Sequence, residues 1–302
     1  MSKIIDQLAA DAGISNKTLL EKDLRLHMLL HAISKDEYLQ ANLAFKGGTC
    51  LIKCYLGYYR FSEDLDFTWI KQKEFENKSQ KEIRRMISKE LDIMLKIIGE
   101  MTHKLGLDFR PEKNNHKYVE FGGSNKFLTL KAWYESEILK TPQFIKIQVN
   151  FLEKIIYPFK TLEAEPIIKK ISRKEFEFLF PEYKDLLEAT KIKCYDLREI
   201  LAEKARAILT RREIKARDFI DIFMILKKEN IGIATLKDHI IEKVRFMMRY
   251  DKYVKNLKGF RLSKFLMEEE EKLLLKPLDP GFEIFLKETE EYILELMEEL
   301  KK

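Results

Sequence analysis

The chain of 302 residues is 45% hydrophobic with only 7 prolines and 11 glycines, which favours a large folded core in two lobes over long disordered linkers. No apolar run is long enough to span a bilayer and the N-terminus lacks a signal-peptide core, so we expect a cytoplasmic protein without membrane contact. The three cysteines, Cys50, Cys54 and Cys194, do not form a disulfide framework.

The net charge of +6 is distributed unevenly. Residues 268–302 carry 12 acidic side chains against 5 lysines, a net charge of −7, so the preceding residues carry +13. A basic body of this kind attracts nucleic acid by releasing condensed counterions. The alternative is that Lys and Glu merely solvate helix faces, and because no sequence-specific RNA-binding motif is present, both interpretations stay open.

The first predicted element is an amphipathic helix over residues 17–33, with leucines along its buried side. His27 and His31 have metal-ligand spacing on this helix, but no third ligand is evident. Packed or surface histidines are therefore the expected outcome.

Residues 42–69 are the most informative segment of the chain. An apolar strand runs into Gly47, Gly48 and Thr49, a short helix follows, and a second strand carries Asp64 and Asp66. Successive strand side chains point to opposite faces, so the two carboxylates share one face while Leu65, Phe67 and Trp69 share the other. Two like charges this close favour a bound cation with oxygen ligands, and we expect Mg²⁺ or Mn²⁺.

The glycines before the short helix predict a phosphate site. A helix N-terminus offers free backbone N–H groups and a partial positive charge. Thr49 is placed as an N-cap or as a hydroxyl donor to a phosphate, and Lys53 lies one turn further on. Strand, Gly-Gly-Thr, helix and acidic strand, in this order, are the layout of a nucleotidyltransferase site. Cys50 and Cys54 share a helix face, and packed thiols are expected there rather than a metal site.

Beyond this site, residues 72–105 are predicted to form one long helix, followed by strands at 127–134 and 144–151 that complete a small mixed sheet. From residue 182 onward we expect helices. In the helix at about 197–211, Lys204 interrupts an apolar stripe, and a buried ammonium calls for an anionic partner unless its stem reaches solvent. The next helix carries Arg217, Asp218 and Asp221, and its Arg217 and Asp221 have ion-pair spacing.

Several of these motifs resemble one known family. Phe45-Lys46-Gly47-Gly48-Thr49, followed by Arg60-Phe61-Ser62-Glu63-Asp64-Leu65-Asp66, is similar to the signature of the AbiEii/AbiGii nucleotidyltransferase family. Leu20-Glu21-Lys22-Asp23, Leu201-Ala202-Glu203-Lys204 and Arg217-Asp218-Phe219-Ile220-Asp221 resemble further motifs in the same order. The resemblance touches about two thirds of the chain. It thins out beyond residue 230.

The resemblance implies an α+β protein with a polymerase β-like nucleotidyltransferase core and a helical C-terminal lobe, which we place at residues 1–165 and 166–302. It implies transfer of a nucleoside monophosphate from an NTP to a tRNA 3′ end, a growth-arresting toxin and an antitoxin encoded nearby, without stable binding. Catalytic roles fall on Asp64, Asp66, Lys204 and Asp218. The nucleotide contacts are Gly47, Gly48, Thr49, Lys53, Arg60, Ser62 and Lys204, and the metal ligands are Asp64 and Asp66.

The chain departs from the superfamily pattern at one point. A third metal-binding acid commonly sits on a neighbouring strand, and here Gln148 or Asn150 takes that place, with only a carbonyl oxygen to offer. The site should therefore hold one metal ion well and a second loosely. Glu63 and Glu153 are the nearest candidates for a base.

Two other functions stay open from the sequence. One is nucleotidylation of a partner protein, and the other is a non-catalytic nucleotide-binding regulatory module. The identities of the NTP and the acceptor are not readable, because base selection depends on pocket walls scattered through the chain. The acidic C-terminal segment has apolar residues at helical spacing, which favours packing on its own domain over binding a partner.

Overall fold

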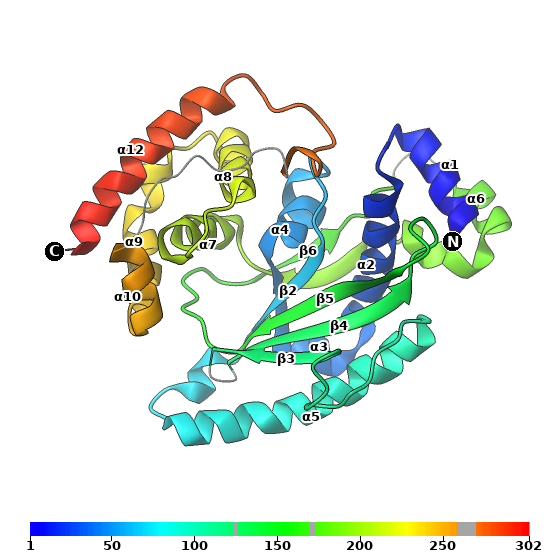
Figure 1. Cartoon of the computed structure of the whole chain (residues 1–302), viewed down its shortest axis with the longest axis horizontal. Coiled ribbons are helices and arrows are strands. Elements are labelled where there is room, and N and C mark those ends of the chain that lie inside the picture. The colour runs from blue at the N-terminus through cyan, green and yellow to red at the C-terminus, as the bar shows by residue number, and fades with distance from the viewer. Residues whose placement is uncertain (124–125, 169–172, 259–269, 302) are drawn as a thin grey trace. The chain divides into compact units, whose positions relative to one another are not determined.

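The computed structural model describes residues 1–123, 126–168, 173–258 and 270–301 (Figure 1). It divides into two compact units: unit 1 comprises residues 1–153 and 159–194, and unit 2 comprises residues 154–158 and 195–302. The predicted boundary at residue 165 falls inside unit 1. Across the described part of the chain, no helix is both long enough and apolar enough to cross a membrane.

A seven-stranded mixed sheet forms the centre of unit 1, in the order β3-β4-β5-β2-β1-β7-β6. Strands β2 and β5 are parallel, as are β1 and β7, while every other neighbouring pair is antiparallel. The strands are β1 (Leu43–Lys46), β2 (Asp64–Trp69), β3 (Val119–Gly122), β4 (Phe127–Glu135), β5 (Pro142–Asn150), β6 (Lys160–Ala164) and β7 (Thr190–Cys194). The expected mixed sheet is confirmed, with β3, β6 and β7 in addition.

The helices of unit 1 follow from its apolar patterning. Helix α2 packs on β2, β5 and β7 through leucines that are almost completely buried (Figure 1). The helices are α1 (Ser2–Ala12), α2 (Lys17–Lys35), α3 (Glu37–Asn42), α4 (Gly47–Cys50), α5 (Gln80–Lys104) and α6 (Arg173–Leu179). A π-helix, η1 (Leu51–Leu56), continues α4, and two 3-10 helices are η2 (Gln72–Phe75) and η3 (Pro181–Leu187).

Two predictions for this unit are wrong in detail. The helix expected over 72–105 is broken, because Asn77 has a φ of 58° and Ser79 starts α5 with a capping box to Glu82. The chain is not helical throughout from residue 182, because residues 190–194 pair with both β6 and β1 as β7. That pairing is why unit 1 extends to residue 194.

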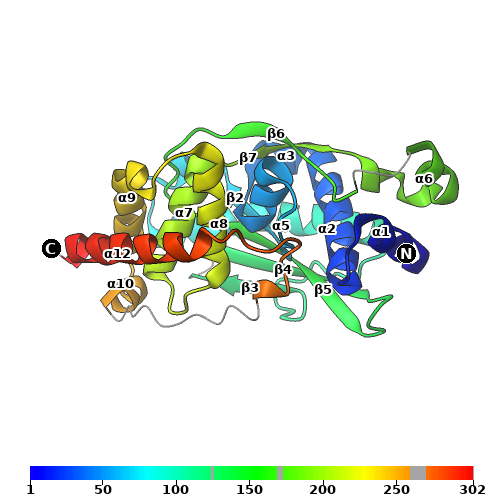
Figure 2. The ribbon, with the colours of Figure 1, turned by 90° about the horizontal axis from the view of Figure 1, so that it is seen from above.

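The main regular elements described in unit 2 are helices. Helix α7 packs against α8, α9 and α10, and α12 packs against α8 and α9, where Phe223 contacts Phe282 and Phe285 (Figure 2). The helices are α7 (Leu197–Thr210), α8 (Ala216–Glu229), η4 (Ile233–Leu236, a 3-10 helix), α9 (Lys237–Met247), α10 (Asp251–Lys258) and α12 (Phe282–Lys301). The acidic C-terminal helix thus packs on its own unit, as expected.

Candidate active site

The turn between β1 and α4 brings backbone against a carboxylate. Gly47 has a φ of 77°, and a Cβ atom there would lie 2.3 Å from Oδ2 of Asp66. A Cβ at Gly48 would lie 2.7 Å from Nη2 of Arg60 and 3.1 Å from Oγ of Ser62. A side chain at Gly47 would be both strained and crowded by Asp66, and a side chain at Gly48 would require Arg60 and Ser62 to shift.

Thr49 connects this turn to the acidic strand. Its hydroxyl donates to the main-chain carbonyl oxygen of Asp64 at 2.5 Å and lies 2.9 Å from Oγ of Ser62. The side chain is almost completely buried, and the N-cap of α4 is Lys46. Thr49 is therefore not the N-cap, and its hydroxyl fixes the start of β2 relative to α4.

The two carboxylates lie on one face of β2, as the alternation predicts. Asp66 stands in register between Lys46 of β1 and Gln148 of β5, and Asp64 stands opposite Lys146. Nζ of Lys146 lies 3.8 Å from Oδ1 of Asp64, and both side chains are partly exposed. On the other face Leu65, Phe67 and Trp69 are buried, with the rings of Phe45 and Phe67 5.4 Å apart.

The sheet register decides which amide replaces the third acid. Gln148 lies beside Asp66, and its Nε2 donates to Oγ1 of Thr129 at 3.3 Å. Asn150 lies beside Thr68 instead, and its Nδ2 donates to Glu153 at 2.6 Å. The expected departure is thus at Gln148, whose carbonyl oxygen is the available metal ligand.

Lys46 is a site residue that the sequence interpretation missed. Its ammonium forms an ion pair with Glu153, which is 6% exposed and also accepts the bond from Asn150. The sequence clue to Lys46 is its place directly before the two glycines, because the strand register sets Lys46 beside Asp66. Glu153, held by a cation and an amide, and Glu63, paired with Lys22 at 2.7 Å, are both poorly suited to act as a base.

Lys53 does not lie free to reach an anion. It is buried, its Nζ lies 3.1 Å from Asp23, and it also contacts Tyr58, whose hydroxyl donates to Asp23 at 2.9 Å. Burial lowers the pKa of Lys53, an effect that Asp23 opposes. We therefore remove Lys53 from the nucleotide contacts, since its charge already neutralises a buried carboxylate.

Unit 2 contains a second charged cluster around Lys204. Nζ of Lys204 lies 2.8 Å from Asp218 and 2.6 Å from Asp221, and Arg211 reaches Asp218 at 2.5 Å. Both aspartates are buried. Burial raises the pKa of Asp218, but Lys204 and Arg211 outweigh that effect and hold the pKa below its ordinary value. Asp218 and Asp221 are thus anionic partners of Lys204, whereas the nucleotide contact that the resemblance implies for Lys204 stays a prediction.

A neighbouring cluster in unit 2 is built around Lys243. This lysine is 2% exposed, lies 2.5 Å from Glu199 and donates to the carbonyl oxygen of Lys154 at 2.8 Å. Glu199 in turn accepts from the backbone N–H groups of Ile156 and Tyr157. These bonds attach residues 154–158 to α7, so the Lys243 cluster is structural.

A family model identifies the family of the chain. The model for the nucleotidyl transferase AbiEii toxin of type IV toxin–antitoxin systems matches residues 29–292. The chain belongs to the AbiEii family. It is accordingly a nucleotidyltransferase enzyme. The family assignment therefore disfavours the alternative of a non-catalytic nucleotide-binding module. The family assignment implies a nucleotide substrate and an antitoxin partner.

One solved structure agrees with the fold of this AbiEii chain, and a second is reported beside it. MenT4, a nucleotidyltransferase toxin from Mycobacterium tuberculosis H37Rv, is 18% identical with a TM-score of 0.50, and the match covers 98% of each chain. JHP933 from Helicobacter pylori is 15% identical with a TM-score of 0.43, over 94% of this chain and 93% of that one. A search of curated protein sequences gave no match.

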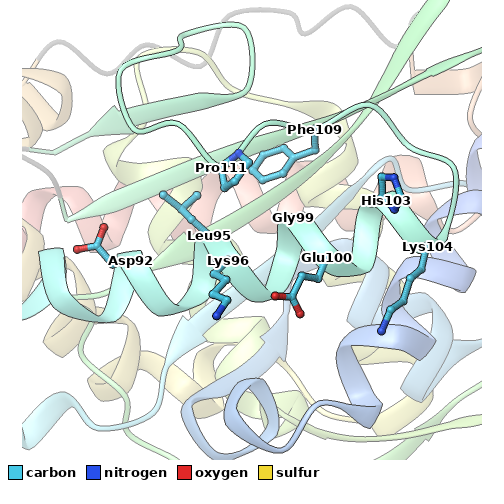
Figure 3. Close-up of a pocket in the computed structure, with 9 residues that line it drawn as sticks. All are labelled: Asp92, Leu95, Lys96, Gly99, Glu100, His103, Lys104, Phe109 and Pro111. Carbon is cyan, nitrogen blue, oxygen red and sulfur yellow. The ribbon is translucent and has the colours of Figure 1, made fainter.

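The predicted site residues do not line the surface hollow that lies beside α5 in unit 1. That hollow, of about 710 Å³, is lined by α5 and the segment after it, including Leu95, His103 and Pro111 (Figure 3). Asp64, Asp66, Gly47 and Gly48 come together instead at the ends of β1 and β2.

Proposed function

We propose that this AbiEii enzyme transfers a nucleoside monophosphate from an NTP to the 3′-terminal hydroxyl of a tRNA. The hydroxyl oxygen forms a bond to the α-phosphorus while the bond to the β-phosphate oxygen breaks. Pyrophosphate leaves, and the hydroxyl proton passes to solvent or a base. Membership of the family supports the reaction class, and the tRNA acceptor is our extension of it.

One observation carries the proposal. The Gly47 backbone packs directly on the carboxylate of Asp66, so the backbone N–H groups that suit a triphosphate lie next to the oxygens that suit a divalent cation. Phosphoryl transfer needs mainly positioning and charge neutralisation. A turn and a carboxylate in contact supply the basis for both.

The residues take separate roles in this proposal. Asp64 and Asp66 would hold Mg²⁺ or Mn²⁺, which when bound would neutralise charge on the phosphates. Gly47 and Gly48 would face the triphosphate. The side chains of Arg60 and Ser62 would pack against Gly48. Two carboxylates with Gln148 as their neighbour favour one firmly held metal ion. Binding of a second metal ion would depend on oxygens of the nucleotide.

The sequence motifs also assign Lys204 and Asp218, in unit 2, to this reaction. Lys204 would neutralise charge that develops on the phosphates, and Asp218 and Asp221 would orient its ammonium. That Lys204 serves the same reaction as Asp64 and Asp66 is a prediction from the sequence motifs.

An RNA acceptor accords with the charge distribution. Residues 1–267 carry +13, and phosphate backbones bind such surfaces through counterion release. A protein acceptor gains no comparable support from the chain.

Two assays test the proposal. RNA 3′-end sequencing after expression in cells should show added nucleotides on tRNA with the wild type and none with Asp66→Asn. In vitro, each labelled NTP is incubated with total RNA or total protein. Label on RNA supports the acceptor, whereas label on protein alone would replace it, and label unaffected by Asp64→Asn and Asp66→Asn would refute the site. The matched control is Asp92→Asn on α5.

A further inference from the structure

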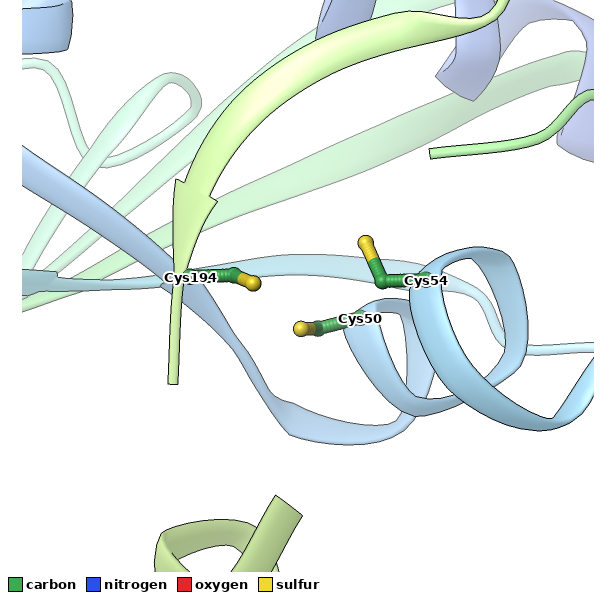
Figure 4. Close-up of side chains that lie close together, drawn as sticks. All are labelled: Cys50, Cys54 and Cys194. Atoms are coloured by element: carbon green, nitrogen blue, oxygen red, sulfur yellow. The ribbon is translucent and has the colours of Figure 1, made fainter. Parts of the chain in front are cut away.

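Three thiols from distant parts of the chain converge in unit 1. The Sγ atoms of Cys50 on α4, Cys54 on η1 and Cys194 at the end of β7 all lie within 4.8 Å of one another. In Figure 4 the side chains of Cys50 and Cys194 point toward each other, with Cys54 beside them. Cys50 and Cys194 are fully buried and Cys54 is partly exposed.

Two features of the backbone produce this convergence. The helix that begins at Gly47 continues as a π-helix from Leu51, and positions four apart stay on one face of it, which sets Cys50 beside Cys54. Strand β7 pairs in parallel with β1, with Cys194 opposite Phe45. Cys194 is therefore fixed against the helix that follows the Gly-Gly-Thr turn.

We propose that these three cysteines form a binding site for one thiophilic d¹⁰ metal ion, with Cu(I) as the best-fitting ion. Thiolates are soft ligands that select such ions over Mg²⁺. Among the described His, Cys, Asp and Glu residues, the cluster has three members and no fourth. A three-coordinate site suits Cu(I), whereas structural Zn²⁺ sites take four protein ligands.

The geometry and charge of the cluster accord with this ion. With metal–sulfur bonds of about 2.3 Å, three sulfurs around one ion lie roughly 4 Å apart, so side-chain rotations that bring the sulfurs slightly closer complete the site. Three thiolates with Cu(I) carry a net negative charge. The ammonium group of Lys160 is an electrostatic neighbour of Cys194, and it offsets part of that charge.

The test is an anaerobic titration of the reduced full-length protein with Cu(I) against a chromogenic competing chelator, with Zn(II) in a parallel arm. We expect one Cu(I) per chain, three sulfur ligands by X-ray absorption and a raised melting temperature. Cys50→Ser, Cys54→Ser and Cys194→Ser should each weaken binding by more than the ~10–100-fold that loss of an outer-shell partner causes. Ile192→Val, on the same strand as Cys194, is the matched control and should bind as wild type does.

Each remaining outcome overturns the proposal. Unchanged Cu(I) stoichiometry in the triple Cys→Ser variant would place the ion elsewhere, and tighter retention of Zn(II) than of Cu(I) would refute the ion. Circular dichroism of every metal-free variant, with Cys194→Ala as a second substitution, separates lost binding from lost folding. The readouts are independent of nucleotidyl transfer.

Discussion

Gly47 combines a left-handed backbone conformation with a close contact to Asp66, a proposed metal ligand. An L-residue with a φ of 77° is strained, and its Cβ would displace the carboxylate of Asp66. The strain alone is a stability effect. Displacement of the Asp66 carboxylate should affect the reaction instead. The loss of stability and the loss of activity can therefore be measured separately.

Gly47→Ala should lower kcat by about 100-fold, the loss that a misplacement of about 1 Å produces. Gly106→Ala is the matched control, because Gly106 also has a positive φ, of 66°, but has open space around its Cβ position. We expect both variants to lose about 1–2 kcal/mol of unfolding free energy in urea titrations. Equal activity in the two variants would show that Asp66 does not need its place against the turn.

Lys204 and Lys243 are two cations of unit 2 that pair with buried carboxylates and have different predicted roles. Lys204→Met and Lys243→Met should each destabilise unit 2 by about 3–5 kcal/mol, because each removes a close cation from buried carboxylates. Only Lys204→Met should also abolish nucleotidyl transfer per folded molecule. Activity is measured well below both melting temperatures, and a comparable loss in Lys243→Met would make the role of Lys204 purely structural.

At the scale of elements, we expect strand β5 to limit how many metal ions the site can hold. Gln148→Asp would set a third carboxylate beside Asp66, which should reduce the Mg²⁺ concentration for half-maximal activity by about tenfold and destabilise the metal-free protein. Gln143→Asp, at the far end of the same strand, should do neither. Thermal melts and activity with titrated Mg²⁺ measure both effects, and an unchanged Mg²⁺ requirement would separate Gln148 from the metal site.

His27 on helix α2 should make the folding stability of the protein sensitive to acid. Burial, and secondarily the charge of Lys53, lowers the pKa of His27 to about 3, while its Nε2 donates to the carbonyl oxygen of Glu188. The unfolded chain binds a proton at His27 below about pH 6.5, whereas the folded chain does not until about pH 3. Protonation therefore favours unfolding within this window.

Stability should fall by up to about 1.4 kcal/mol per pH unit as the pH drops below about 6.5. His27→Gln, which keeps a donor for Glu188, should lack this component of the slope, and exposed His103→Gln should retain it. Urea unfolding at pH values between about 7 and 5 measures the difference. Identical slopes in wild type and His27→Gln would contradict the assignment.

The elements differ in how far the sequence predicts them. The alternation of β2 gives its two faces, and apolar periodicity gives α2 and most of α5 and α7, because these signals are local. The pairing of β7 with β1 is not local: residues 190–194 are short and partly polar, and only a partner far along the chain makes them a strand. The convergence of Cys194 with Cys50, and the choice of Gln148 over Asn150, depend on this kind of register.

At the scale of the whole molecule, the uneven charge predicts how RNA binding responds to salt. If about five phosphates are contacted, the logarithm of affinity should fall against the logarithm of salt concentration with a slope of roughly −3.5. Fluorescence anisotropy with labelled tRNA and the Asp66→Asn protein avoids turnover. A flat response would show that the lysines only solvate helix faces.

The position of β7 also sets when the enzyme can become active during its synthesis. β1, which leads into the Gly-Gly-Thr turn, lacks one of its two neighbours until residue 194 has left the ribosome. Residues 154–158 likewise await Glu199. At about 5–20 residues per second, the nascent chain spends about 7–30 s without a complete sheet around its active-site turn. Any host that makes this enzyme therefore meets its activity only after most of the chain exists.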